Sequence, residues 1–135
     1  LMKLYILLFS FLLLFSSCAL KVNETEARSV AESLLTDMKN ENYSGLDKYF
    51  TDLSNVGLSH EKKEEVYRRL KDTAGPIKSF EFLEAKEEYD SQQHLNQLTL
   101  KYKVVFEKIT MLQTFLFIND EGDSRIIFQN IENLK

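Results

Sequence analysis

The hydrophobic pattern of the chain changes its period near Gly75 and Pro76, and this change constrains the fold more than any other feature. Before it, apolar residues recur every three or four positions, which is typical of amphipathic helices. After it, they alternate with polar residues, which is typical of strands with one covered face. A glycine followed by a proline usually ends a helix. Helices followed by consecutive strands predict an α+β domain with an antiparallel sheet.

Three helices are expected before the change of period. The first covers about 24–40, with Asn23 as its N-terminal cap, and the third covers about 60–73, with Ser59 as its cap. A short second helix is expected over about 45–53, and the segment 51–58 is expected to be a loop. Apolar side chains of the second and third helices are predicted to face the core: Leu46, Tyr49, Phe50, Leu53, Val66, Tyr67 and Leu70.

Four strands are expected after it, over about 79–89, 98–106, 111–118 and 125–131. Polar segments between them predict turns, and Gly122 suits the hairpin turn at 119–123 because it can adopt a positive φ. We expect a curved four-stranded antiparallel sheet with the helices on one face and the other face wet or used for pairing. Three aromatic side chains are expected between the sheet and the helices: Phe115, Phe117 and Phe128.

An apolar run lies near the N-terminus, from Leu4 to Phe15, with Lys3 before it. As a helix its twelve residues would rise about 18 Å, whereas a bilayer core is about 30 Å thick. The run is therefore short for a transmembrane helix and fits the apolar region of a signal peptide.

The end of this run, Phe15-Ser16-Ser17-Cys18, resembles the lipobox of bacterial lipoproteins, although Phe15 departs from the usual leucine. The resemblance implies cleavage between Ser17 and Cys18, and a mature Cys18 that carries a thioether-linked diacylglycerol and usually an amide-linked acyl chain such as palmitate. More than one chain gives stable anchoring. Two alternatives remain, an ordinary secretory signal with a leftover cysteine and an uncleaved short anchor. Cys18 is the only cysteine, so the domain forms no internal disulfide.

This interpretation divides the chain into a signal peptide (1–17), the lipidated cysteine with a short tether (18–23) and a single α+β domain (24–135). The first segment carries one lysine and no acidic residue. The remaining 118 residues therefore carry 16 basic and 21 acidic residues, a net charge near −5. Such a charge argues against binding nucleic acid or adhering electrostatically to anionic lipid, so membrane attachment is expected through the lipid on Cys18.

Candidate catalytic residues are few. His60 is expected in the first turn of a helix among charges, and His94 in a polar turn, so both are interpreted as solvated residues. Asp47 is interpreted as a cap or a surface charge. Core packing with the hydroxyl at a rim is the expected role of Tyr43, Tyr49, Tyr67 and Tyr102.

Other chemical signatures are missing from the sequence. The spacing of histidine, cysteine and acidic residues predicts no metal site. There is no glycine-rich phosphate loop and no nucleophile elbow. We therefore expect no catalytic residue, no metal and no cofactor.

The order of elements resembles the cystatin-like fold of the nuclear transport factor two-like superfamily, and within it small bacterial envelope lipoproteins. The features that carry this resemblance span about 26–132: the segment 42–50 after a long helix, the helix that opens at 58–61 and ends at 74–79, and the strands 98–106, 115–119 and 125–130. The resemblance implies a cone-shaped sheet that encloses a pocket. Members include isomerases, dehydratases, binding modules and dimers, so the fold does not select a function.

The expected function is that of a lipid-anchored extracytoplasmic lipoprotein of the bacterial cell envelope, acting as a non-enzymatic module that binds a partner protein or a small apolar ligand. In a Gram-negative cell, Ala19 after Cys18 favours the outer membrane. One alternative is a small isomerase- or hydratase-like enzyme that uses the cone pocket, and another is a purely structural or stress-related surface antigen. Apolar residues on both faces of the third strand, Leu112, Leu116 and Ile118 against Phe115 and Phe117, suggest a homodimer through the sheet.

Overall fold

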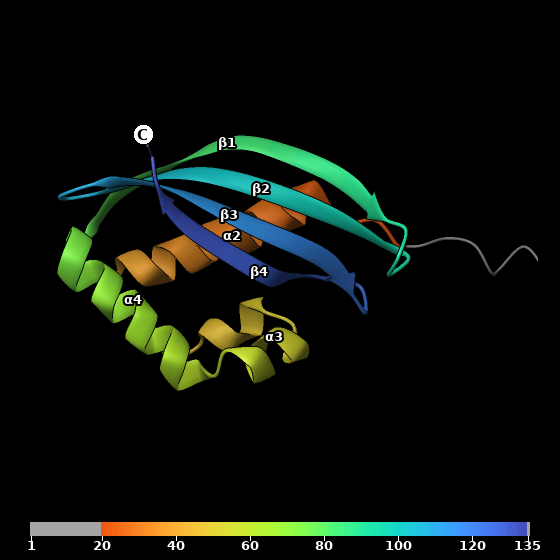
Figure 1. The fold of residues 1–135 in the computed structure, drawn as a ribbon, viewed down its shortest axis with the longest axis horizontal. Helices are drawn as coiled ribbons and strands as arrows, with labels where there is room; N and C mark the ends of the chain where they lie inside the picture. The colour runs from red at the N-terminus through yellow and green to blue at the C-terminus, as the bar shows by residue number, and fades with distance from the viewer. Residues whose placement is uncertain (1–19, 135) are drawn as a thin grey trace, which may run out of the picture.

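The computed structural model describes residues 20–134 as an α+β domain in which helices pack against a four-stranded antiparallel sheet (Figure 1). The predicted signal peptide, its cleavage position and Cys18 lie outside this range. The elements, in chain order, are α2 (Glu24–Lys39), the 3-10 helix η2 (Leu46–Tyr49), α3 (Asp52–Gly57), α4 (His60–Ala74), β1 (Ile77–Asp90), β2 (Leu95–Phe106), β3 (Thr110–Asp120) and β4 (Asp123–Asn133).

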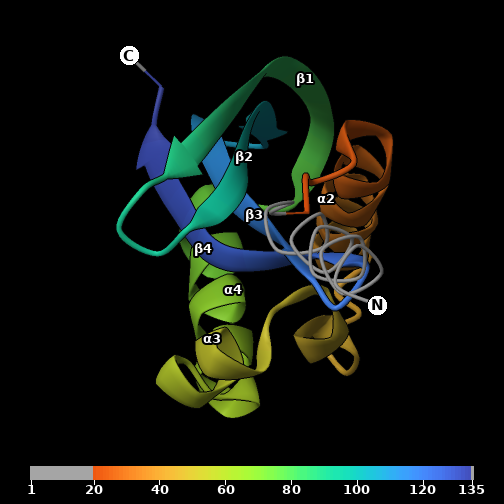
Figure 2. The same ribbon diagram turned by 90° about the vertical axis from the view of Figure 1, so that its right-hand side faces the viewer.

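The sheet is a meander with the strand order β1-β2-β3-β4, so every strand pairs with its neighbour in the sequence. The sheet bends strongly, and the helices lie on one side of it (Figures 1 and 2). This is the predicted fold class. A meander leaves two open edges, β1 on one side and β4 on the other.

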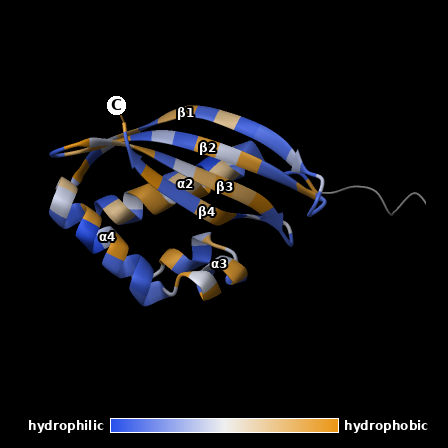
Figure 3. Ribbon diagram, in the orientation of Figure 1, coloured by the Kyte–Doolittle hydropathy of each residue, from blue (hydrophilic) through white to orange (hydrophobic). Residues whose placement is uncertain are grey.

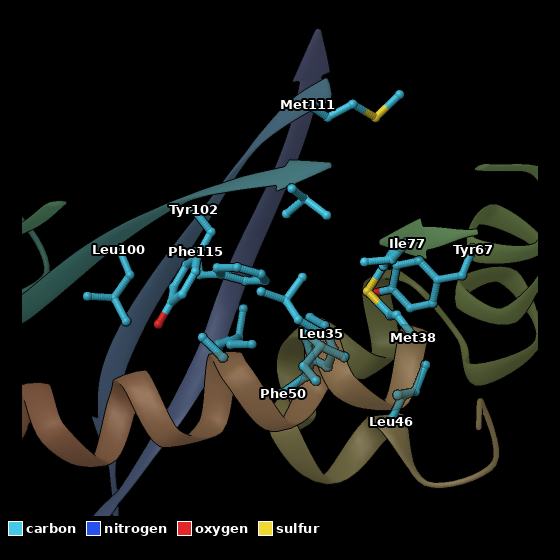
Figure 4. Close-up of a cluster of buried hydrophobic side chains, with 14 of the residues drawn as sticks. Leu35, Met38, Leu46, Phe50, Tyr67, Ile77, Leu100, Tyr102, Met111 and Phe115 are labelled. Atoms are coloured by element: carbon cyan, nitrogen blue, oxygen red, sulfur yellow. The ribbon is translucent and has the colours of Figure 1, made fainter. Parts of the chain in front are cut away.

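The core lies between the inner face of the sheet and α2. Every second residue of β2 is buried from Leu98 to Phe106, which confirms the predicted alternation. Side chains from the sheet and from the helices point toward one another in this core, among them Leu35 and Met38 of α2 and Tyr102 and Phe115 of the sheet (Figure 4). Burying a large apolar side chain stabilises a fold by roughly 1.5–3 kcal/mol.

The ends of the long helices are where local sequence predicts them. Asn23 Oδ1 accepts a hydrogen bond from the backbone N–H of Glu26 at 3.0 Å, and Ser59 caps α4 by accepting from Lys62 N–H. The helix α4 ends at Gly75, whose φ is +83°. A Cβ at this position would lie 2.7 Å from Cβ of Glu107, so both the backbone conformation and the space require glycine.

The region between α2 and α4 differs from the prediction. The expected helix over 45–53 is only the 3-10 helix η2, and the expected loop over 51–58 contains α3. The chain is extended at Phe50 because Phe50 forms a parallel bridge with Ile126 of β4. Thr51 then caps α3 by accepting a hydrogen bond from Ser54 N–H at 3.2 Å. Leu53, predicted to face the core, is 82% exposed.

Two further apolar residues were predicted inside and lie outside. Phe128 is 57% exposed, whereas Phe115 and Phe117 are buried as expected. The physical reason is a bulge in β4: Phe117 pairs with Ile126 but Leu116 pairs with Phe128, so one extra residue, Ile127, sits between them and shifts the alternation. Val66 of α4 is 45% exposed, because it faces a groove instead of the core.

Candidate binding groove

A groove separates the edge strand β4 from α3 and α4. We call it the β4 groove; it holds about 290 Å³ and is lined by Phe50, Ser54, Leu58, Lys63, Val66, Tyr67, Ile127, Phe128, Gln129 and Ile131. A hollow of about 540 Å³ adjoins it, because both share Ser54 and Ile127 as wall residues. Most of the groove's walls are apolar, and hydrophobic residues appear on α3 and along β4 in Figure 3.

Exposed apolar side chains gather around this groove. Three exposed large hydrophobic side chains line it, Leu58, Val66 and Phe128, and a fourth, Leu53, lines the adjoining hollow. Scattered exposed apolar residues are normal on a protein surface, but a cluster at a concave site is typical of an interaction site. The β4 groove is therefore the candidate functional site of the described residues.

The floor of the groove carries a chain of polar side chains. The Tyr67 hydroxyl donates a hydrogen bond to Gln129 Oε1 at 2.6 Å, and Gln129 Nε2 donates to Gln113 Oε1 at 3.1 Å. Burial raises the pKa of the Tyr67 phenol well above its ordinary value, and the hydrogen bond to Gln129 only partly offsets this. Tyr67 is therefore neutral at physiological pH, with its proton committed to Gln129.

Gln113 of β3 is the last side chain in this series of hydrogen bonds. Its side chain is fully buried, and its Nε2 has no hydrogen-bond partner in the structure. An amide buried in this way costs stability. We conclude that Tyr67, Gln129 and Gln113 fix the packing of α4 against β3 and β4, and with it one wall of the groove.

A buried lysine holds the other wall. Lys63 of α4 is 1% exposed, and its Nζ lies 2.9 Å from Asp47 Oδ1 and also donates a hydrogen bond to Asn55 Oδ1. The same ammonium lies 4.4 Å from the ring centroid of Phe50. Asp47 is the second residue of η2, and Asn55 belongs to α3. The Lys63 ammonium therefore joins α4 to both short helices.

The structure brings two of the candidate catalytic residues together. Asp47 Oδ1 lies 3.8 Å from His60 Nδ1, and His60 Nε2 lies 3.6 Å from Glu64 Oε2. These contacts sit at the start of α4, and neither Asp47 nor His60 lines the β4 groove. His94 lies far along the chain in the β1–β2 turn, with its Nδ1 3.3 Å from the Tyr89 hydroxyl.

The four tyrosines that were predicted to pack with a hydroxyl at a rim have different surroundings. The Tyr49 hydroxyl donates to Asp37 Oδ2 at 2.5 Å, and burial, with this bond, raises the pKa of Tyr49 to about 12. Tyr43 packs 6.3 Å from Tyr67 between ring centroids, and burial raises its pKa too. The ring of Tyr102 lies inside the core, against Phe115 at 6.0 Å (Figure 4).

Burial raises the pKa of Tyr102 to about 12, although the nearby Arg28 guanidinium acts in the opposite direction. The Tyr102 hydroxyl has no partner that meets hydrogen-bond geometry. Large side chains such as Tyr102, Phe115 and Leu35 fill the space under the bend of the sheet. A second crevice, beside Tyr43 and Tyr67, holds only about 10 Å³. A hollow of about 390 Å³ on α2 is lined mainly by polar side chains such as Glu32 and Asp37. Among these hollows of residues 20–134, those with largely apolar walls and an open mouth lie at the β4 edge.

Sequence reasoning did not find this groove. Val66 and Phe128 line the groove, but helical spacing and strand alternation had predicted that both side chains face the core. One signal was present: Ile126, Ile127 and Phe128 are three consecutive apolar residues in a strand that should alternate. Such a break in period is what a bulge produces.

The described residues 20–134 contain no helix long and apolar enough to cross a membrane. Within the same range, no group of three or more histidine, cysteine or acidic side chains is placed to hold a metal ion. No protein-family model and no curated protein matches this chain.

Proposed function

We propose that this protein is a lipid-anchored module of the bacterial cell envelope that binds an apolar ligand in the β4 groove without catalysing a reaction. Three features support the proposal. The N-terminal segment ends in a lipobox-like sequence at Cys18, the rest of the chain is acidic, and the described domain carries an open apolar groove. The cystatin-like resemblance fits a small extracytoplasmic binding domain of this kind.

The observation that carries the binding role is the chemistry of the groove walls. The polar side chains of Tyr67 and Lys63, which line the groove, already have partners: Tyr67 donates to Gln129, and Lys63 is held by Asp47 and Asn55. What the walls offer to a ligand is apolar surface, from residues such as Val66 and Ile127. An apolar ligand gains roughly 25 cal/mol for each Å² of apolar surface that it removes from water.

A dye-binding titration tests the groove. The chain from Cys18 onward, with Cys18→Ser, is titrated with Nile red, an uncharged dye whose fluorescence rises on apolar surfaces. Val66→Lys should reduce the fluorescence gain severalfold, because it places an ammonium in the groove. Leu83→Lys is the matched control: Leu83 is also 45% exposed but lies on β1, away from the groove. Equal loss in both variants would rule out the groove as the binding site.

The anchor has its own test. Intact-mass analysis of the protein from its native membrane should show cleavage before Cys18 together with the added mass of the diacylglycerol and acyl chains. Cys18→Ser should abolish the added mass and release the protein from the membrane fraction. An unmodified, uncleaved chain would contradict the lipoprotein assignment and leave the groove proposal standing.

A further inference from the structure

The two open edges of the sheet differ in chemistry. Along β1, charged side chains recur from Lys78 to Asp90, and the pairing with β2 is interrupted by bulges. These are the features by which proteins protect an edge strand from pairing with other chains. Along β4, the six residues from Ile126 to Ile131 carry no charge. β4 has one bulge of its own, at Ile127, but the uncharged edge beyond it makes β4 the less protected of the two edges.

A segment of the same chain already pairs with this edge at Ile126. Phe50 forms a parallel bridge with Ile126, and Thr51 N–H donates a hydrogen bond to Ile126 C=O at 3.0 Å. The pairing stops there because Asp52 begins α3 and the chain turns away from the sheet. An extended backbone segment thus fits this edge, and from Ile127 onward no other strand of the described residues pairs with it.

The direction of the backbone groups follows from the register. Leu134 N–H donates to Thr110 C=O, toward β3. Successive residues of an antiparallel strand direct their backbone N–H and C=O groups to opposite sides. The N–H and C=O groups of Gln129, Ile131 and Asn133 therefore point away from β3, toward the open side. The open edge from 127 to 133 is about 20 Å long at ~3.3 Å per residue, enough for a short strand.

The β4 groove lies directly beside this edge. Val66 and Leu58 form its far wall, and Ile131 lies on the strand itself. A strand added to β4 would direct every second side chain to the same face of the sheet as the groove. Peptide recognition by strand addition works in this way: main-chain hydrogen bonds provide affinity, and pockets for alternate side chains provide specificity.

We infer that the open edge of β4 and its groove bind an extended peptide segment of another protein, which adds a strand to the sheet and places alternate apolar side chains in the groove. This inference rests on the proposed function and names the class of ligand. Asp52 and Asp120 line the adjoining hollow; Asp120 is paired with Arg125 at 3.4 Å, and Asp52 favours a basic residue at the end of the peptide that lies in the hollow. A second copy of this chain has a net negative charge, the same sign as Asp52 at this site.

A peptide selection tests the inference. Random decapeptides displayed on phage are selected against the full-length chain held in lipid nanodiscs, with empty nanodiscs as counter-selection. Enriched peptides should share alternating apolar residues and contain no proline between them. Val66→Lys should weaken their binding at least tenfold, and Leu83→Lys should leave it unchanged. Circular dichroism checks that both variants fold.

Methylation of the peptide backbone provides the decisive measurement. N-methyl groups placed one at a time along an enriched peptide should weaken binding about tenfold at every second residue and have little effect at the residues between. Binding that Val66→Lys weakens, but that N-methyl groups weaken without a period of two residues, would overturn strand addition. The groove would then remain an apolar binding site. The inference would be overturned if no peptide were enriched over empty nanodiscs, or if Val66→Lys left peptide binding unchanged. It would also be overturned if light scattering showed a dimer of this chain that Val66→Lys abolishes, because a second copy would then occupy the groove.

Discussion

At the scale of single residues, the buried ammonium of Lys63 is the contact on which the groove depends most. We predict that Asp47→Ala lowers the free energy of unfolding by about 2 kcal/mol, because it leaves Lys63 with Asn55 as its remaining hydrogen-bond partner. Urea unfolding measures this loss. Asp52→Ala, in the exposed first turn of α3, should change stability by less than about 0.5 kcal/mol. Equal effects would contradict the role of Lys63.

The raised pKa of Tyr102 predicts how the stability of the protein changes at high pH. The pKa of Tyr102 in the folded protein is about 12, above the ordinary 10.0. As the pH rises above 10, the unfolded chain loses this proton first, so the contribution of Tyr102 to stability is complete below pH 10 and is lost as the pH approaches 12. Urea unfolding at pH 9 and pH 11 should show a smaller fall for Tyr102→Phe than for the natural chain. Parallel falls would contradict this assignment.

Residue-scale features were predictable from sequence where their partners are close in the chain. The caps Asn23 and Ser59 act on residues three positions away, and both were correctly assigned. Lys63 was not singled out, because its partner Asp47 lies sixteen residues away on another element. A lysine in a helix usually faces water, and only the packing of three elements shows that this one does not.

At the scale of elements, the end of α4 depends on a single backbone conformation. Gly75→Ala should cost about 2 kcal/mol or more, because alanine is strained at φ +83° and its Cβ would meet Glu107. Gly57→Ala is the control: Gly57 ends α3 with free space around it, so alanine should be neutral or slightly stabilising. Thermal unfolding of both variants checks the prediction, and a neutral Gly75→Ala would refute it.

Element prediction succeeded for long periodic segments and failed where tertiary contacts overrode a local pattern. The helices α2 and α4 and the four strands lie close to their predicted positions. The segment around Phe50 has helical spacing of apolar residues, yet it is extended because Phe50 pairs with Ile126, far along the chain. The bulge at Ile127 likewise depends on the register with β3. These two non-local features are the ones that form the groove.

At the scale of the whole molecule, the outer face of the sheet bears on self-association. Leu112, Leu116 and Ile118 are half-buried on this face of β3, beside Lys101 and Lys103 of β2. The sheet-to-sheet homodimer stays a prediction. Light scattering on the Cys18→Ser chain from residue 18 onward should show a dimer that Leu116→Lys disrupts and Val66→Lys does not. A monomer at every concentration measured would contradict it.

The order of the elements has a consequence for how the chain is made. Within residues 20–134 every helix precedes every strand, and the sheet is complete only with the last strand, Asp123–Asn133. While a ribosome is still synthesising the chain, the apolar sides of α2 and α4 lack a complete sheet to cover them, so we expect folding to be completed only with the C-terminal strand. We therefore expect a chain of this order to stay unfolded until almost all of it has been made, which would suit the export proposed for it.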